Sequence, residues 1–165
     1  MIMKSKFKPS GPFWQVISLG MLAGMRSTSA PAVASHILSD DHSNHLSKSP
    51  LNFMQSKSVA NALKAALAGE LITDKLPFTP DRIKTSSVIV RCLAGSLAGA
   101  SVYKACKESP VKGALLGGTA AVLSTFGSFY LRKAVVSGTK LSDPVVGAIE
   151  DALVLTAGAA LIYTA

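Results

Sequence analysis

Five segments of the chain are poor in charged residues, and short clusters of charge, proline and serine separate them. None alternates apolar and polar residues over the length of a strand, and glycine and alanine disfavour a sheet. We therefore expect an all-α fold in a single domain, residues 1–165: a compact multi-pass transmembrane bundle of about five Gly/Ala-rich helices. The expected spans lie near residues 12–38, 58–76, 86–106, 111–133 and 143–164.

The low charge of these segments indicates lipid rather than water as their surroundings. Only 16% of the 165 residues are charged, against about a quarter in soluble domains. The last three segments carry small residues on all faces and lack the polar face of a soluble surface helix. A stretch such as 111–131 would form a helix of about 31 Å, the thickness of a bilayer core. A hydrophobic content of 48% excludes a disordered chain.

Glycine pairs at a spacing of four residues are a second feature of the apolar segments. Such small-xxx-small pairs let helix backbones approach closely in a membrane. In a soluble helix, each glycine would cost about 1 kcal/mol of stability. The pairs therefore predict sites of close helix contact. They are Gly20 with Gly24, Gly95 with Gly99, and Gly113 with Gly117.

The distribution of basic residues predicts an orientation. If all five segments cross, nine lysines and arginines lie on the side of the N-terminus and five on the other. The positive-inside rule then places the basic tail, residues 1–11, in the cytoplasm and the C-terminus outside. We expect an inner (cytoplasmic) membrane. A cleaved secretory signal is the alternative for the first segment, although Arg26 and the hydroxyls after it disfavour one.

The sequence GMRSTSAP in the first segment combines a helix breaker with polar side chains. Pro31 cannot donate a helical hydrogen bond to Ser27, so the helix should kink or break there. Arg26, Ser27 and Thr28 lie beside the break. Two interpretations stay open: a broken helix that lines a solute or ion site, and a kinked helix whose Arg26 forms a structural ion pair.

The second segment ends in the sequence GELITDKLPFTPDR, which carries two carboxylates one helical turn apart. Glu70 and Asp74 share a helix face, and Lys75 follows them. Two carboxylates on one face can hold a cation or pass a proton. They can equally form a buried ion-pair network with Arg26, Lys64 or Arg91.

The last segment carries a second acidic pair, Glu150 and Asp151, about two turns inside its helix. Adjacent residues point about 100° apart on a helix, so one of the two should face the bundle interior, and we expect Glu150. A histidine-containing loop follows the first segment, but it lacks cysteine and the spacing of a metal site, and no metal is predicted. No nucleotide-binding or catalytic motif is present, so we expect no cofactor and no enzyme activity.

A weak internal similarity indicates an inverted repeat. The sequence GMLAGMRSTSAP, from Gly20, aligns with GGTAAVLSTFGS, from Gly117. The sequence AGELI, around Glu70, similarly matches AIEDA, around Glu150. An offset of three spans would make the copies antiparallel, as in many transporters.

These motifs together resemble a bacterial integral-membrane family catalogued as domain of unknown function 4126. The most specific elements are E-x-x-x-D-K-x-P, formed by Glu70, Asp74, Lys75 and Pro77, and the late pair Glu150 and Asp151. The resemblance covers about residues 14–155. It implies a multi-pass membrane protein without signal cleavage, and it implies no established activity.

Three functions are compatible with the sequence. The first is a small channel or transporter for an ion or small solute, which lies in the lipid bilayer as a homo-oligomer. The second is a non-transporting structural or lipid- or partner-binding module whose buried charges form ion pairs. The third, a basic protein that binds nucleic acid, is disfavoured because the basic residues are spread over every loop. The pathway or charge network would comprise Arg26, Ser27, Thr28, Glu70, Asp74, Lys75, Arg91, Glu150 and Asp151.

Overall fold

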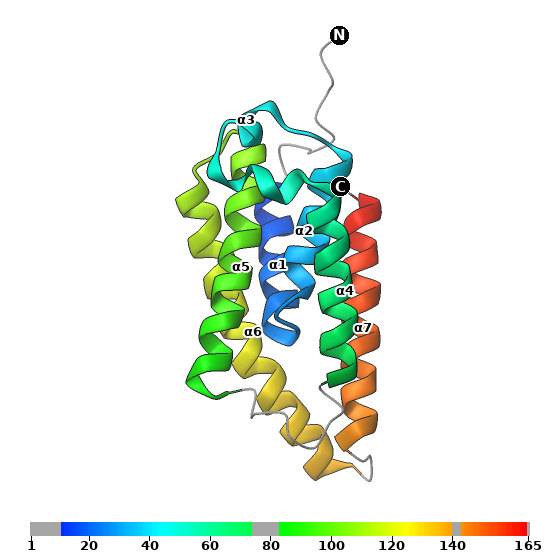
Figure 1. Cartoon of the computed structure of the whole chain (residues 1–165). Coiled ribbons are helices and arrows are strands. Elements are labelled where there is room, and N and C mark those ends of the chain that lie inside the picture. The colour runs from blue at the N-terminus through cyan, green and yellow to red at the C-terminus, as the bar shows by residue number, and fades with distance from the viewer. Residues whose placement is uncertain (1–10, 74–82, 140–142, 165) are drawn as a thin grey trace.

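A computed structural model describes residues 11–73, 83–139 and 143–164 of the chain. These residues form helices and no strand, which confirms the predicted all-helical class (Figure 1). The elements are α1 (Pro12–Met25), α2 (Ser29–Asp40), α3 (Asn44–Ser47), the 3-10 helix η1 (Pro50–Gln55), α4 (Lys57–Thr73), α5 (Thr85–Ala105), α6 (Pro110–Gly138) and α7 (Asp143–Thr164).

The segment expected to be one span, 12–38, is two short helices that form a hairpin. Helix α1 enters the bundle from the upper end in Figure 1, and α2 returns to the same end. With 14 and 12 residues, they extend about 21 and 18 Å, less than a bilayer core of about 30 Å. The single span at 12–38 is therefore wrong, although a break was predicted at the right place.

The chain reverses at Arg26, where the backbone leaves the helical region with φ −140° and ψ 119°. Pro31 lies in the first turn of α2, where its missing N–H leaves no helical hydrogen bond unmade. The proline thus helps to start α2 rather than to kink a continuous helix. We call residues 26–28 the hairpin tip.

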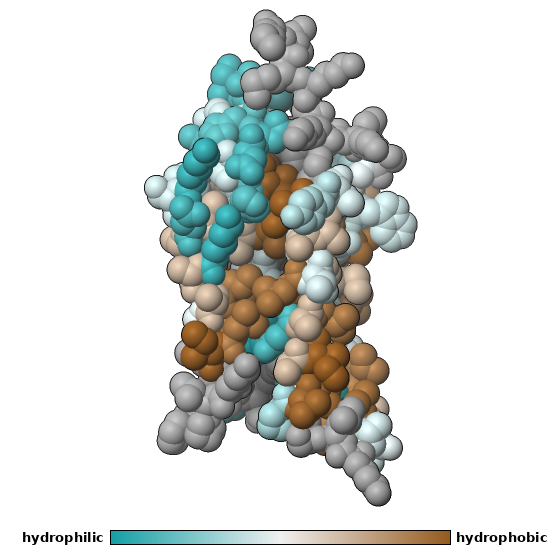
Figure 2. All heavy atoms as spheres, turned by 90° about the vertical axis from the view of Figure 1, so that its right-hand side faces the viewer, coloured by the Kyte–Doolittle hydropathy of each residue, from teal (hydrophilic) through white to brown (hydrophobic). Residues whose placement is uncertain are grey.

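Three of the described helices are long and apolar enough to cross a membrane: Thr85–Ala105, Pro110–Gly138 and Pro144–Thr164. They expose large apolar side chains such as Leu93, Leu123 and Leu153. On the face turned to the viewer in Figure 2, hydrophilic residues gather toward the upper end and hydrophobic ones lie below. These features are consistent with a membrane protein, but the expected count of five spanning helices is not confirmed.

The helix directions also differ from those of an inverted repeat. Gly20 of α1 lies against Gly117 of α6, and Gly24 lies against Ala121 and Thr125, so the two helices run in the same direction. An inverted copy must run in the opposite direction. The predicted inverted repeat is therefore not present in α1 and α6. Their shared small residues instead serve the contact between them.

The glycine pairs are sites of very close packing, as the sequence predicts. A Cβ atom added at any of the six paired glycines would approach another atom to less than 3.0 Å. The pair on α5 faces the pair on α6 directly, and the pair on α1 faces α6. No side chain larger than hydrogen fits there, so α1, α5 and α6 form one tightly packed unit.

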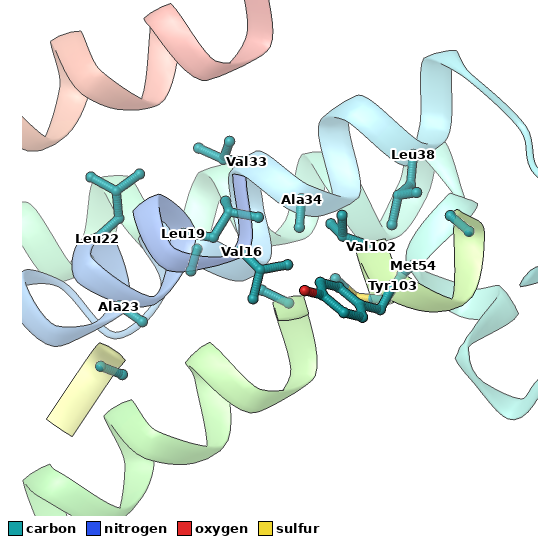
Figure 3. Close-up of a cluster of buried hydrophobic side chains, with 14 of the residues drawn as sticks. Val16, Leu19, Leu22, Ala23, Val33, Ala34, Leu38, Met54, Val102 and Tyr103 are labelled. Atoms are coloured by element: carbon teal, nitrogen blue, oxygen red, sulfur yellow. The ribbon is translucent and has the colours of Figure 1, made fainter. Parts of the chain in front are cut away.

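The hydrophobic core joins this unit to the rest of the hairpin. Leu19 and Val16 of α1, Leu38 of α2 and Val102 of α5 are at most 1% exposed. Figure 3 shows them with Met54 of η1 in one cluster between the helices. Both arms of the hairpin are thus anchored in the core, and its tip is carried into the bundle.

The hairpin changes the expected topology. Helices α4, α5, α6 and α7 run in alternating directions, so α1 begins and α7 ends toward the upper end of the bundle (Figure 1). We predict that reporter fusions at the N-terminus and at the C-terminus report the same side of the membrane. A fusion placed after Gly138 is the control and should report the other side. Opposite sides for the two termini would contradict the hairpin.

The close helix contacts predict a contrast between two glycines of α6. Leucine at Gly117 would overlap the carbonyl of Gly95 and should lower the free energy of unfolding by about 3 kcal/mol. A Cβ atom at Gly127 has no neighbour within 4 Å, so leucine there should not lower it, because leucine also favours a helix more than glycine does. Denaturation of the purified protein in detergent measures both. Equal effects would show that the Gly95–Gly117 contact is absent.

Candidate functional site

The hairpin tip leaves backbone polar groups without helical partners. The last carbonyls of α1 and the first N–H groups of α2 cannot bond within their own helices. Water satisfies such groups in a soluble protein, but the interior of a membrane bundle offers only other protein groups. Side chains from four other helices supply partners or charges around the tip.

Glu70 of α4 binds the start of α2. Its Oε1 accepts hydrogen bonds from the backbone N–H and the hydroxyl of Ser27, both at 2.9 Å. Its Oε2 accepts from the backbone N–H of Thr28 at 2.9 Å and from the hydroxyl at 2.5 Å. The positive end of the α2 dipole favours a negative charge at this position. The carboxylate thus occupies a preformed anion site with four donors.

The carbonyls at the end of α1 are bound from the opposite side of the tip. The Gly24 carbonyl accepts hydrogen bonds from the guanidinium of Arg91 on α5 and the hydroxyl of Thr125 on α6, both at 3.2 Å. The hydroxyl of Ser124 donates to the Met21 carbonyl at 2.8 Å. Arg91 is buried, with 5% of its surface exposed. These bonds hold the broken end of α1 to α5 and α6.

Arg26 connects the tip to the last helix. Its Nε donates to Oδ1 of Asp151 on α7 at 3.0 Å, and its Nη2 contacts the same oxygen. The Arg26 side chain is 3% exposed and that of Asp151 is 13% exposed. A charge pair so withdrawn from solvent is costly to break, because the remaining charge stays buried.

Glu150, which we expected to face the interior, and its neighbour Asp151 are both largely buried, with side chains 12% and 13% exposed. Glu150 pairs with Arg132 of α6, at 3.3 Å between Oε2 and Nη1, while Asp151 reaches the tip. The rotation of α7 about its axis decides between these adjacent residues. Arg132, Ser124 and Thr125 were not among the predicted residues, although hydroxyls and a cation in an apolar helix are a detectable signal.

The structure brings together most of the predicted residues. Six of them lie at the tip or contact it directly, and Glu150 pairs beside Asp151 in α7. Asp74 and Lys75 fall outside the described residues. Those that gather at the tip are Arg26, Ser27, Thr28, Glu70, Arg91 and Asp151.

Glu70 is the carboxylate whose charge the hydrogen bonds at the tip depend on. In the described part of the chain, no group of three or more His, Cys, Asp or Glu residues could hold a metal ion. Glu70 can accept all four hydrogen bonds only as a carboxylate, because a protonated carboxyl carries a donor of its own. Protonation would also remove the charge that the α2 dipole attracts. A proton on Glu70 therefore weakens its bonds to Ser27 and Thr28.

A family model described as "Domain of unknown function (DUF4126)" matches residues 14–164. This range contains the hairpin tip and nearly all of the described helices, and it confirms the resemblance found in the sequence. Neither a curated protein nor a solved structure matches the chain.

The Arg26–Asp151 pair predicts that two substitutions on α7, each of which removes a negative charge, have unequal effects on stability. Asp151→Asn should lower the free energy of unfolding by about 3 kcal/mol, because it leaves the buried Arg26 facing a neutral amide. Glu150→Gln should cost about 1 kcal/mol, because its partner Arg132 is 20% exposed and can reach solvent. Thermal and denaturant unfolding in detergent compare them. A larger loss for Glu150→Gln would contradict this assignment of the buried pair.

Proposed function

The chain belongs to the DUF4126 family, and from the geometry of its hairpin tip we propose that it is a small multi-pass membrane transporter. It would move an ion or a small solute past the tip and couple that movement to a proton on Glu70. The observation that supports this proposal is the set of four hydrogen bonds from Ser27 and Thr28 to the Glu70 carboxylate.

Broken helices are a recurring device of transporters. Their half-helix N-termini point at anionic groups near the middle of the membrane, and irregular backbone is tolerated where it lines such a site. Here the anionic group belongs to the protein itself. A carboxylate that binds either a proton or the hairpin links proton movement to hairpin movement, which is the requirement for coupled transport.

The packing around the hairpin supports movement of one arm. Helix α1 is fixed to α6 through Gly20 and Gly24, where the backbones leave no free space. The start of α2 is instead held by polar contacts, from Glu70 to Ser27 and Thr28, and Asp151 holds Arg26 just before it. Release of these two carboxylates would free the start of α2, while its later turns stay in the core and α1 stays in place.

The charge pairing supports a second candidate. Arg26 pairs with Asp151, Arg132 pairs with Glu150, and Arg91 binds a carbonyl. Such a closed network is what a non-transporting structural or partner-binding module would need to stabilise a broken helix. In that module, Glu70 caps α2 permanently and never exchanges its hydrogen bonds for a proton.

We propose a homo-oligomer in the cytoplasmic membrane of a bacterium, because so few short helices enclose little volume for a pathway. The basic tail would place the N-terminus in the cytoplasm, and the hairpin would bring the C-terminus to the same side. The bilayer is the expected partner, and nucleic acid is not.

Proton flux distinguishes the two candidates. Wild-type protein in liposomes with an internal pH-sensitive dye should dissipate an imposed pH gradient in the presence of its ion or solute. Glu70→Gln should reduce this flux at least tenfold, because an amide cannot exchange a proton. Glu108→Gln, an exposed site after α5, is the matched control and should keep wild-type flux. No flux for any common ion or solute with the wild type would favour the structural module.

A further inference from the structure

We propose that a groove between α2, α4 and α7 binds one acyl chain of an anionic phospholipid, whose headgroup lies at Lys64. This site is separate from the hairpin tip and does not depend on transport. The groove residues come from three helices. They are Ser29, Ala32, Val33 and His36 of α2, Lys64 and Leu67 of α4, and Val154, Leu155, Gly158, Ala159 and Ile162 of α7.

The groove has the size and lining of a binding site for a hydrocarbon chain. Its volume is about 170 Å³, and its surface is almost entirely apolar. An apolar cavity of about 150 Å³ stays dry and holds a six-carbon ring. This groove can therefore hold a stretch of about six chain carbons, and water would bind there poorly.

The shape of the groove favours an occupant that arrives from the membrane. Residues of α2, α4 and α7 line it together. A Cβ atom at Gly158 would lie 3.1 Å from Val33, so α7 and α2 are closely packed where they border the groove. Figure 2 shows the side of the molecule on which α7 lies in Figure 1, and hydrophobic residues cover much of its middle and lower part. The opening thus lies on a surface that lipid chains would contact.

One charged side chain at the groove determines which lipid fits. Lys64 is exposed, and its Nζ lies 3.2 Å from Nδ1 of His36. In the part of the chain that the structure describes, no carboxylate lies within 4.0 Å of this ammonium. A lysine two turns inside an apolar helix normally has a counter-charge or extends toward the headgroups. A negatively charged headgroup supplies that counter-charge.

The depth of Lys64 along α4 leaves room for an acyl chain in the part of the groove below it. Helix α4 begins at Lys57, so Lys64 lies about 10 Å along the helix from its upper end. Leu67 is one turn deeper, and the groove continues to Ser29 beside the hairpin tip. A chain attached to a headgroup at Lys64 would lie along the groove toward the tip. One lysine near the membrane surface contributes about 1 kcal/mol to binding of an anionic lipid, which is about a fivefold preference.

Native mass spectrometry of the purified protein tests this site. The probe is an equimolar mixture of phosphatidylglycerol and phosphatidylcholine with identical chains. Wild-type protein should retain one phosphatidylglycerol about five times as often as phosphatidylcholine. Lys64→Gln should bring the ratio close to one, whereas Lys57→Gln, at the start of the same helix, should keep it. Ala159→Leu fills the groove and should remove the retained lipid, whereas Ala160→Leu, which does not line the groove, should not.

Three results would overturn the proposal. Wild-type protein could retain no lipid or retain both lipids equally. Lys57→Gln could reduce the preference as much as Lys64→Gln, which would indicate a general basic surface. A second copy of the chain could occupy the groove, in which case Ala159→Leu would dissociate a dimer. Unfolding temperatures of the four variants in detergent must match the wild type, and Ala159→Val is the smaller substitution if Ala159→Leu does not fold.

Discussion

The structure depends on one constraint: a helix that ends inside an apolar bundle must find partners for the backbone groups it frees. The two ends at the hairpin tip meet this need in opposite ways. Glu70 accepts from the N–H groups at the start of α2, and Arg91 and Thr125 donate to the Gly24 carbonyl at the end of α1. Because these side chains come from α4, α5 and α6, the tip fixes where those helices lie.

The glycine contacts and the tip depend on each other. Gly24 has two roles, because its carbonyl binds Arg91 and Thr125 and its missing side chain lets α1 approach α6. A larger residue there would push Thr125 away from the carbonyl. Close packing is thus a condition for hydrogen bonding at the tip, and the polar contacts in turn hold the helices in register.

The sequence predicts the helices, the break and the glycine contacts, because each follows from a local pattern. It does not predict that the chain reverses at Arg26, since a kink and a reversal use the same local residues. The choice depends on Glu70, 43 residues away from Ser27, which binds the start of a separate helix. For a similar reason, the sequence does not predict that Asp151 rather than Glu150 reaches the tip, because the rotation of α7 depends on its contacts with α2 and α6 rather than on its own sequence.

The two arms of the hairpin, α1 and α2, are packed differently. This difference relates the tip to the groove. Helix α1 cannot shift without overlapping the backbone of α6 at Gly20 and Gly24. Helix α2 borders the groove over about two turns, from Ser29 to His36, and Glu70 holds its start. If Glu70 releases the tip, the start of α2 is the part of the hairpin that can move, and the groove is the apolar space beside it. A bound acyl chain would therefore oppose that movement.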